Sequence, residues 1–269
     1  MTAAIHRIDQ RLLDKRVTIH LAGVGGNGAQ MAACLARLDI AIRALGHPHG
    51  LFVHAFDPDL VTESNVGRQL YSPSDIGASK AIITLTRLNH FYGLDWDASA
   101  CRIEEHWNRS QRSGSRDGDI LISCVDSRAA RRTIHEHLFA GARYCYWLDL
   151  GNMGSEGQVV LGTPSPKKVH VSDQNGERLP CITELYPDLL NPNISEDDVP
   201  SCSVRHSLVA QGLFVNDIIV RHAAHLLYEL FSCGQLNTHG VYCSLKAHRS
   251  APLMVDPDAC KRLICDTCN

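Results

Sequence analysis

A glycine-rich turn is the first feature of this sequence that could carry chemistry. It lies between an apolar run and a helical pattern, and its members are Gly23, Gly25, Gly26, Asn27 and Gly28. Glycines let the backbone approach a phosphate or a ribose, and the free N–H groups at a helix start favour anions. Asp57 follows the next apolar run, where a carboxylate can accept hydrogen bonds from ribose hydroxyls. These residues predict a nucleotide site, and they fit NAD, FAD and ATP equally well.

The segment after Asp57 holds a second group of polar residues and decides between these nucleotides. Its members are Asp59, Asn65, Arg68, Gln69 and, at the start of the next helical pattern, Lys80. Transfer of an adenylyl group builds negative charge on the α-phosphate and on the departing pyrophosphate. Arginine binds phosphate with two parallel hydrogen bonds, and lysine acts as a mobile point charge. The segment therefore favours ATP, and an NAD-dependent oxidoreductase stays as an alternative that rests on the glycines and Asp57 alone.

Asp126 stands at the carboxyl end of a third apolar run, Ile120–Val125. Open α/β sheets bind their ligands at this end of the strands. A carboxylate in that place suits Mg²⁺, which binds phosphates through one or two carboxylates and several waters. Aspartate is also a common cap for a helix start, and a helical pattern begins at Ser127. We favour the metal role, and a capping role could accompany it.

Alternating strand and helix patterns must position these residues. The predicted strands are Val17–Leu21, Leu51–Phe56, Ile120–Val125, Tyr144–Leu150 and Gln158–Leu161, and the predicted helices are Asn27–Leu45, Ser79–Phe91 and Ser127–Phe139. This order predicts an α/β fold with a doubly wound, Rossmann-like, mainly parallel sheet that is covered on both faces. We expect the strands after Leu161 to add a mixed or antiparallel portion.

The second half of the chain differs in character from the first. Residues 162–202 hold six of the eleven prolines, show little periodicity and predict a long crossover loop. A helical pattern follows from Ser203 to Phe231, and Gly240–Lys246 with Pro252–Val255 predicts a hairpin. We read residues 1–269 as one domain with a nucleotide-binding half at 1–161, a crossover loop at 162–202, and a helix, hairpin and tail at 203–269.

Composition excludes several classes of protein. The 269 residues are 44% hydrophobic, carry a formal net charge of −3, and contain no block of basic residues that would mark a nucleic-acid or membrane surface. The chain has no apolar run suited to a bilayer and no secretory leader at its start. Its eleven cysteines are odd in number and scattered, which is typical of reduced thiols. We therefore expect a cytoplasmic protein with no nucleic-acid or membrane partner.

The polar motifs resemble those of the ThiF/MoeB/ubiquitin-activating-enzyme superfamily. Its pattern, GxGGxG followed by DxDxVxxSNxxRQ and a GxxK-like turn, is filled by Gly23–Gly28, Asp57–Gln69 and Gly77–Lys80. The resemblance covers nearly the whole chain and implies a single ThiF-like adenylation domain. It also implies that Asp57 holds the ribose, that Asn65, Arg68 and Lys80 surround the triphosphate, and that Asp126 holds Mg²⁺. The family's CTDN-like string reads Cys124-Val125-Asp126-Ser127 here, so its Asn is replaced.

The resemblance also implies an activity and partners. Members activate the C-terminal carboxylate of a small ubiquitin-like protein with ATP, and they are generally homodimers in which an N-terminal Arg reaches the other subunit's nucleotide. Arg7, Arg11 and Arg16 are the candidates in this chain. The closest form of the resemblance is the ThiF-related protein of the PRTRC cassette, through the strings Leu179–Pro187 and Pro200–Ser203. A non-catalytic adaptor that keeps the fold to recognise a ubiquitin-like partner is the other alternative.

Cysteines supply the last candidate residues. Cys202 lies just before a predicted helix, where the helix dipole lowers the pKa of a thiol, and the resemblance implies that it could accept the acyl group as a thioester. An inert buried thiol is the alternative. Many relatives bind zinc through two CxxC pairs; here the pair Cys265–Cys268 is present, and Cys181 stands alone where the first would fall. This irregular set favours a chain without zinc, and the fifteen histidines show no spacing typical of a zinc protease.

Overall fold

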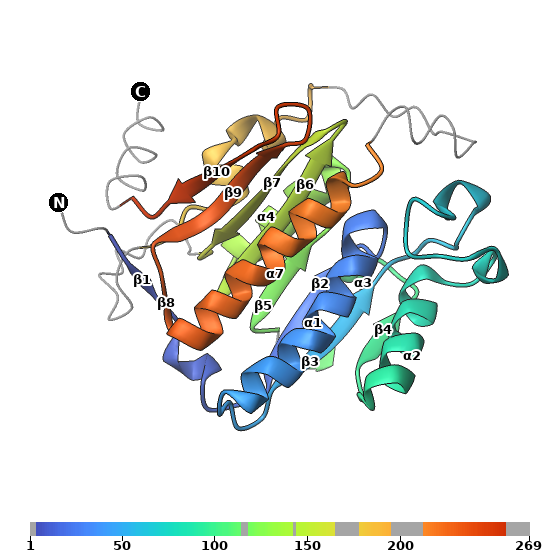
Figure 1. The fold of residues 1–269 in the computed structure, drawn as a ribbon, viewed down its shortest axis with the longest axis horizontal. Helices are drawn as coiled ribbons and strands as arrows, with labels where there is room; N and C mark the ends of the chain where they lie inside the picture. The colour runs from blue at the N-terminus through green and yellow to red at the C-terminus, as the bar shows by residue number, and fades with distance from the viewer. Residues whose placement is uncertain (1–3, 114–117, 142–143, 165–177, 195–211, 257–269) are drawn as a thin grey trace.

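A central sheet of eight strands organises the computed structural model, which describes residues 4–113, 118–141, 144–164, 178–194 and 212–256. The strand order is β10-β9-β7-β6-β5-β2-β3-β4 (Figure 1). Five neighbouring strands are parallel: β2 (Val17–Ala22), β3 (Leu51–Phe56), β4 (Asp97–Ser99), β5 (Ile120–Ser123) and β6 (Tyr146–Met153). The remaining three are antiparallel: β7 (Glu156–Gly162), β9 (Thr238–Ser244) and β10 (Arg249–Met254). The predicted mainly parallel sheet with a later antiparallel portion is confirmed.

Helices cover both faces of the sheet. One face carries α1 (Gly26–Ala44), α2 (Lys80–Tyr92) and α7 (Val215–Cys233), and Figure 1 shows α1 and α7 lying side by side across it. The other face carries α3 (Ile103–Ser113), α4 (Arg128–Phe139) and the short α5 (Ile182–Leu185). A separate pair of short strands, β1 (His6–Arg7) and β8 (Gln235–Leu236), joins the N-terminal segment to the residues that follow α7. No helix in the described ranges is long and apolar enough to cross a membrane.

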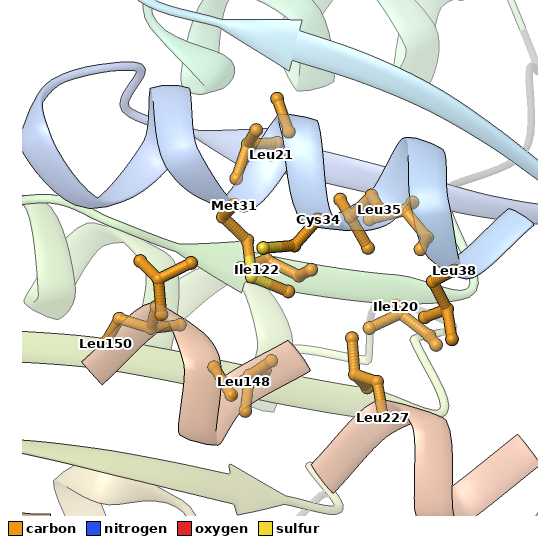
Figure 2. Packing of buried hydrophobic residues seen from close by; sticks show 14 of the residues in the cluster. Leu21, Met31, Cys34, Leu35, Leu38, Ile120, Ile122, Leu148, Leu150 and Leu227 are labelled. Atoms are coloured by element: carbon orange, nitrogen blue, oxygen red, sulfur yellow. The ribbon is translucent and has the colours of Figure 1, made fainter. Parts of the chain in front are cut away.

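The larger of two apolar cores lies between the sheet and the α1–α7 face. Leu21, Ile122 and Leu148 extend from neighbouring strands and meet Met31 of α1 and other apolar side chains of α1 and α7 (Figure 2). The strands are apolar on both faces because each face is covered by helices, which is typical of parallel sheets. A smaller core under α3 and α4 is built around Trp107, Leu121 and Trp147. The two cores hold the carboxyl ends of the parallel strands in fixed positions.

Local sequence signals set the helix ends. The Ser79 side chain accepts a hydrogen bond from the Ile82 amide at the start of α2, and Gly93 ends that helix in the left-handed conformation. Gly234 ends α7 in the same way. The part of the chain that the structure describes contains four 3₁₀ helices, η1 (Gln10–Leu12), η2 (Glu63–Asn65), η3 (Pro73–Asp75) and η4 (Pro187–Leu190). Two of them, η2 and η3, shape the segment between Asp57 and Lys80.

The structure corrects three of the sequence expectations about elements. The predicted helix Ser203–Phe231 does not run unbroken, because residues 212–214 form a turn and α7 begins at Val215. The crossover loop is not uniformly irregular, since α5 and η4 lie within it. The sequence analysis also missed α3 and β4, because α3 shows the sheet only a narrow apolar edge at Ile103 and Trp107. The reading of the chain as one domain stays a prediction.

Candidate functional site

The glycine-rich turn lies at the point where the order of the sheet reverses. From β2 the chain runs outward to β3 and β4 on one side, whereas β5 and β6 lie on the other side. Gly23 directly follows β2, and its amide donates to the Phe56 carbonyl at 2.8 Å. A Cβ on Gly23 would lie 2.8 Å from the Cys124 carbonyl oxygen, and the residue has φ +87°. Only glycine therefore fits between the ends of β3 and β5, where doubly wound sheets bind their ligands.

The start of α1 packs directly against this turn. A Cβ on Gly28 would lie 1.9 Å from the Gly23 carbonyl oxygen. Gly25 faces the amide of Gln69, and Gly26 lies against Asn216 at the start of α7. All five residues of the predicted turn are thus brought together at one helix N-terminus. The first amides of α1 point toward the space above the turn, which is an arrangement that attracts anions.

Asp57 shapes the turn from the end of β3. Its Oδ2 accepts a hydrogen bond from the Val24 amide at 2.6 Å, and its Oδ1 accepts one from the Asp59 amide at 2.8 Å. The side chain is buried, and this burial raises the pKa of the carboxyl group against the opposing effect of the two amides and of Lys80. Asp57 therefore holds the glycine turn in place, and each oxygen keeps a second lone pair for a hydroxyl donor.

Lys80 opens α2 and turns back toward Asp57. Its Nζ donates to the Asp59 Oδ2 at 2.9 Å, and its backbone amide donates to the Asp59 carbonyl. The Lys80 side chain is 9% exposed, whereas that of Asp59 is 63% exposed. Most of the lysine stem is thus fixed in position, while its partner is solvated. Lysine in such a place can offer its charge to an incoming phosphate.

Arg68 and Asp126 form the second charged part of the site. Arg68 is half-buried, and burial lowers its pKa while the nearby Asp126 raises it. Asp126 is exposed beyond the end of β5. The helix cap that the sequence assigned to Asp126 is supplied instead by Ser127, whose Oγ accepts from the Ala130 amide at 3.1 Å. The carboxylate of Asp126 is therefore not occupied by capping.

Asn65 and Gln69 have different positions in the same segment. Asn65 is buried, and its Oδ1 accepts hydrogen bonds from the amide and hydroxyl of Thr62 within η2. The Gln69 side chain lies against Gly25, and its backbone amide donates to the Asn65 carbonyl at 2.9 Å. Asn65 thus has a clear structural role in the loop. Gln69 faces the glycine turn directly.

Three buried polar atoms around the turn have no hydrogen-bond partner among the described residues. They are the Asn27 Oδ1, the Gln69 Oε1 and the Asn152 Nδ2. Asn27 and Asn152 are bonded to one another through their other amide atoms at 2.7 Å. Buried polar atoms without partners are costly, and they are found where a ligand or water completes the bonding. A polar molecule bound over the turn would meet this requirement.

The family of the chain follows from the sequence comparison. The ThiF family model matches residues 3–252. This chain belongs to the ThiF family. The ThiF match includes the glycine turn, the Asp57–Lys80 segment and Asp126, which the structure brings to one edge of the sheet.

Curated relatives of this ThiF-family chain include activating enzymes for ubiquitin-like modifiers. The ubiquitin-like modifier-activating enzyme 6 of Mus musculus is 26% identical over 196 residues, which cover 71% of this chain and 16% of that enzyme. The ubiquitin-like modifier-activating enzyme 5 of Drosophila sechellia is 30% identical over 136 residues, which cover 47% of this chain and 31% of that enzyme. The chain therefore spans less than a third of the length of these relatives.

Solved structures share the fold of this ThiF-family chain. PaaA matches with a TM-score of 0.54 and 15% identity, over 89% of this chain and 64% of PaaA. The complex of E. coli MccB with ATP matches with a TM-score of 0.53 and 13% identity, over 91% of this chain and 65% of MccB. Identities this low concern the fold alone.

The cysteine candidates of the ThiF-family chain lie apart from the glycine turn or outside the described ranges. Cys181 is fully buried at the start of α5, in the smaller apolar core, and its amide donates to the Glu184 carboxylate at 2.8 Å. Cys202, Cys265 and Cys268 lie outside the described residues. The residues that directly follow Cys202 also lie outside the described ranges, so the expected effect of a helix dipole on its thiol stays a prediction. The thioester and zinc roles stay predictions.

Sequence reasoning missed Asn152 and Tyr71. The Tyr71 hydroxyl donates to the Val24 carbonyl at 2.5 Å and lies 3.3 Å from the Thr84 hydroxyl, so it ties α2 to the turn. Burial raises the pKa of Tyr71 well above its usual value. Asn152 has a signal in the sequence, because it stands two residues after the run predicted as a strand, at the edge where ligands bind. Tyr71 has none, since its partners come from other elements.

Proposed function

We propose that this chain uses ATP to adenylate the C-terminal carboxylate of a small ubiquitin-like protein. The observation that carries the proposal is the gathering of Asp57, Lys80, Arg68 and Asp126 around one glycine turn at the switch point of the sheet. A site that only holds the fold together has no need of two half-buried or buried cations beside a glycine turn. A site for triphosphate chemistry does, because negative charge grows on the phosphates during transfer.

The geometry suggests how ATP would lie. The phosphates would rest over the first amides of α1, where the glycines leave room and the helix dipole favours negative charge. The ribose would meet Asp57 through the lone pairs that the Val24 and Asp59 amides do not use. The unpartnered amide atoms of Asn27, Gln69 and Asn152 would take up polar groups of the same molecule.

The residues present fit a magnesium ion. Asp126 is an exposed carboxylate close enough to Arg68 to act on its charge, and Mg²⁺ needs only one or two carboxylates besides phosphates and water. When bound, the ion would neutralise phosphate charge. Arg68 and Lys80 would do the same from the protein side, Arg68 with two parallel hydrogen bonds and Lys80 with a point charge that it shares with Asp59.

The reaction needs positioning more than acid–base chemistry. An oxygen of the partner's carboxylate would form a bond to the α-phosphorus of ATP, and the bond from that phosphorus to the pyrophosphate oxygen would break. The products are an acyl-adenylate and pyrophosphate, which leaves as an anion. A carboxylate is already a nucleophile at neutral pH, so the protein would contribute by orientation and by stabilising charge. The Cys202 thiolate could then take the acyl group as a thioester and release AMP.

A homodimer is part of the proposal. Arg11 forms an ion pair with Asp9, and Arg16 forms one with Asp95 and lies 5.1 Å from the Phe52 ring centre. Arg7 is exposed in β1, beside β8 and away from its own glycine turn (Figure 1). Of the three N-terminal arginines, Arg7 is therefore the one that the geometry favours for reaching the nucleotide of a second copy.

Arg68→Ala tests the proposal. We expect this variant to keep its fold and to lose ATP–pyrophosphate exchange by at least about 100-fold, because removal of one charge-stabilising donor costs that much in comparable sites. The assay would contain purified protein, Mg²⁺, ATP and a candidate small ubiquitin-like protein with an intact C-terminus. Circular dichroism and thermal unfolding would show whether the fold is kept.

Two controls accompany this test. Arg249→Ala removes an exposed arginine on the edge strand β10 and should leave exchange unchanged. A partner lacking its last residues should give no exchange with the wild-type chain. Wild-type rates from Arg68→Ala would contradict the adenylation mechanism. Calorimetric ATP binding without any exchange would support the adaptor alternative instead.

A further inference from the structure

Two histidines face one another across the parallel strands just below the glycine turn. His20 of β2 and His54 of β3 are direct register partners, so their side chains extend from the same face of the sheet. Asp97 of β4 is the next residue in the same row. This face is the one covered by α3 and α4, opposite α1 and α7. The row therefore lies outside the nucleotide site described above.

Helix α3 brings a third histidine over this row. The His106 ring centre lies 5.1 Å from that of His20 and 5.1 Å from that of His54. One ring nitrogen from each of His20, His54 and His106 lies within 4.8 Å of the other two. It is the one group of potential metal ligands of this kind among the described residues. His20 is buried, and the other two are half-buried.

Hydroxyl groups surround the three rings. His20 Nδ1 lies 2.6 Å from the Tyr144 hydroxyl, His54 Nε2 lies 2.8 Å from the Ser99 hydroxyl, and His106 Nε2 lies 3.3 Å from the Ser110 hydroxyl. A metal uses one nitrogen of an imidazole, and a hydrogen bond at the other nitrogen commonly sets the orientation of the ring. For the hydroxyls to serve that purpose, the ion would use the opposite nitrogens, which are His20 Nε2 and the Nδ1 atoms of His54 and His106.

A carboxylate lies beside the three rings, because Asp97 is the register partner of His54 on β4. Asp97 is exposed and close enough to act on His54, so it could offset part of the charge of a bound cation.

We propose that His20, His54 and His106 bind a divalent transition-metal ion of the zinc class. Three imidazoles with a fourth position left for water are a known ligand set for Zn²⁺, with Zn–N distances of about 2.0–2.1 Å. Ligands of a tetrahedral ion with these bond lengths lie about 3.4 Å apart, so the rings would close by about an ångström on binding.

The bound ion would add a link between one helix and two strands that already pair with one another in the sheet. It would link α3 to β2 and β3, the two strands whose carboxyl ends carry Gly23 and Asp57. His20 and His54 each stand three positions before these residues in the chain. The ion would therefore stabilise the strand ends that support the nucleotide site, and it would do so from the opposite face of the sheet.

Cobalt titration of metal-free protein tests the proposal. The protein would first be treated with a chelator, in a Cys265→Ser/Cys268→Ser background that removes the thiolates of the C-terminal tail. We expect about one equivalent of Co²⁺ to bind, with visible d–d bands typical of tetrahedral nitrogen ligation and no thiolate charge-transfer band. Zn²⁺ should displace the cobalt and raise the melting temperature by several degrees.

Histidine variants locate the site. His106→Gln and His54→Gln, made in the same background, should each weaken Co²⁺ binding by about 100-fold or more and remove the thermal shift with Zn²⁺. His225→Gln on α7 is the matched control, because His225 is exposed and pairs only loosely with Glu229 at 3.6 Å. It should bind like the parent.

The outcomes decide the proposal in either direction. Loss of binding in His106→Gln with a metal-free melting temperature close to the parent's supports the site, because misfolding is then excluded. Equal binding by the parent, His54→Gln and His106→Gln would overturn it. Absence of any Co²⁺ binding by the folded parent would also overturn it and would identify the three histidines as an aromatic packing cluster. Neither readout depends on adenylation.

Discussion

Asp57 accepts hydrogen bonds from two backbone amides before any ligand arrives. One of these amides belongs to the glycine turn, so the carboxylate fixes the shape of the turn as well as the end of β3. Lys80 and Asp59 are paired in a similar way. At the residue scale, the charges of the site are thus held by partners in their own chain. The structure supports a site that is largely formed in advance, which reduces the free energy needed to order it.

Asp75 provides a test of pH dependence at the same scale. Arg87 donates to both of its oxygens, and this pairing lowers the pKa of Asp75 to about 2. Since the folded-state pKa lies below the unfolded value near 3.9, the stabilisation is complete above about pH 4 and is lost as the pH falls toward 2. We expect Asp75→Asn to be less stable than wild type near neutral pH.

The same variant should also lose stability less steeply on acidification. Urea unfolding at several values from about pH 5 to about pH 2 would give the two curves. Arg87→Gln should behave similarly, because it removes the other partner. Parallel curves for wild type and Asp75→Asn would contradict this role of the pair.

The glycine turn and α1 pack directly against one another, because the Gly23 carbonyl leaves no room for a side chain at position 28. Helix propensity alone would favour alanine at this helical position by about 1 kcal/mol. The clash acts in the opposite direction, because overpacking of a tight site costs about 1–3 kcal/mol. The close contact between α1 and the turn therefore explains why position 28 is a glycine, although helix propensity favours alanine there.

Gly28→Ala should accordingly lower the free energy of unfolding by about 1–2 kcal/mol and weaken ATP binding by displacing the turn. Urea unfolding and calorimetry with ATP would measure the two effects. Gly46→Ala is the comparison variant: it follows α1 with φ +105° and has nothing within 4 Å of the added Cβ. It should cost only backbone strain and leave ATP binding unchanged. If Gly28→Ala were more stable than wild type and bound ATP normally, the turn would be able to shift away from the added Cβ, and the prediction would be wrong.

Different interactions attach the helices to the two faces of the central sheet. The α1–α7 face is apolar, whereas the α4 face contains a buried ion pair between Arg131 of α4 and Asp149 of β6 at 3.0 Å. Asp149 also accepts from the Ser123 hydroxyl at 2.6 Å, so the pair joins α4 to two strands. A buried pair of this kind is weak evidence for net stability, but breaking it leaves an unpaired charge inside the protein.

Arg131→Met should therefore lower the free energy of unfolding by about 3–5 kcal/mol. Arg131→Met/Asp149→Leu should recover part of this loss, because the second change removes the unpaired carboxylate. Denaturant unfolding of both variants would test the expectation, with the exposed Arg249→Met as control. If the double variant were less stable than Arg131→Met, an unpaired buried carboxylate would not be the cause of the loss, and the expectation would be contradicted.

Much of the fold could be predicted because its signals are local. The apolar run Leu51–Phe56 gave the bounds of β3, and the pattern that began at Ser79 placed α2 to within one residue. Helix α3 was not predicted, because two buried apolar residues, Ile103 and Trp107, are too few to give a clear helical period of hydrophobicity. The start of α7 was misplaced because the apolar pattern continues through residues 212–214, where the backbone is not helical and α7 begins only at Val215.

The sequence by itself determined the elements with a clear apolar pattern and the spacing of the ThiF motifs, because both depend on neighbours in the chain. Only the tertiary structure decided which side chains meet. It placed Asp126 near Arg68, paired Asn27 with Asn152, and gathered His20, His54 and His106 under α3. The physical reason is that these contacts depend on strand order and register across the sheet. Both are set by the packing of the entire core, and no short stretch of sequence contains that information.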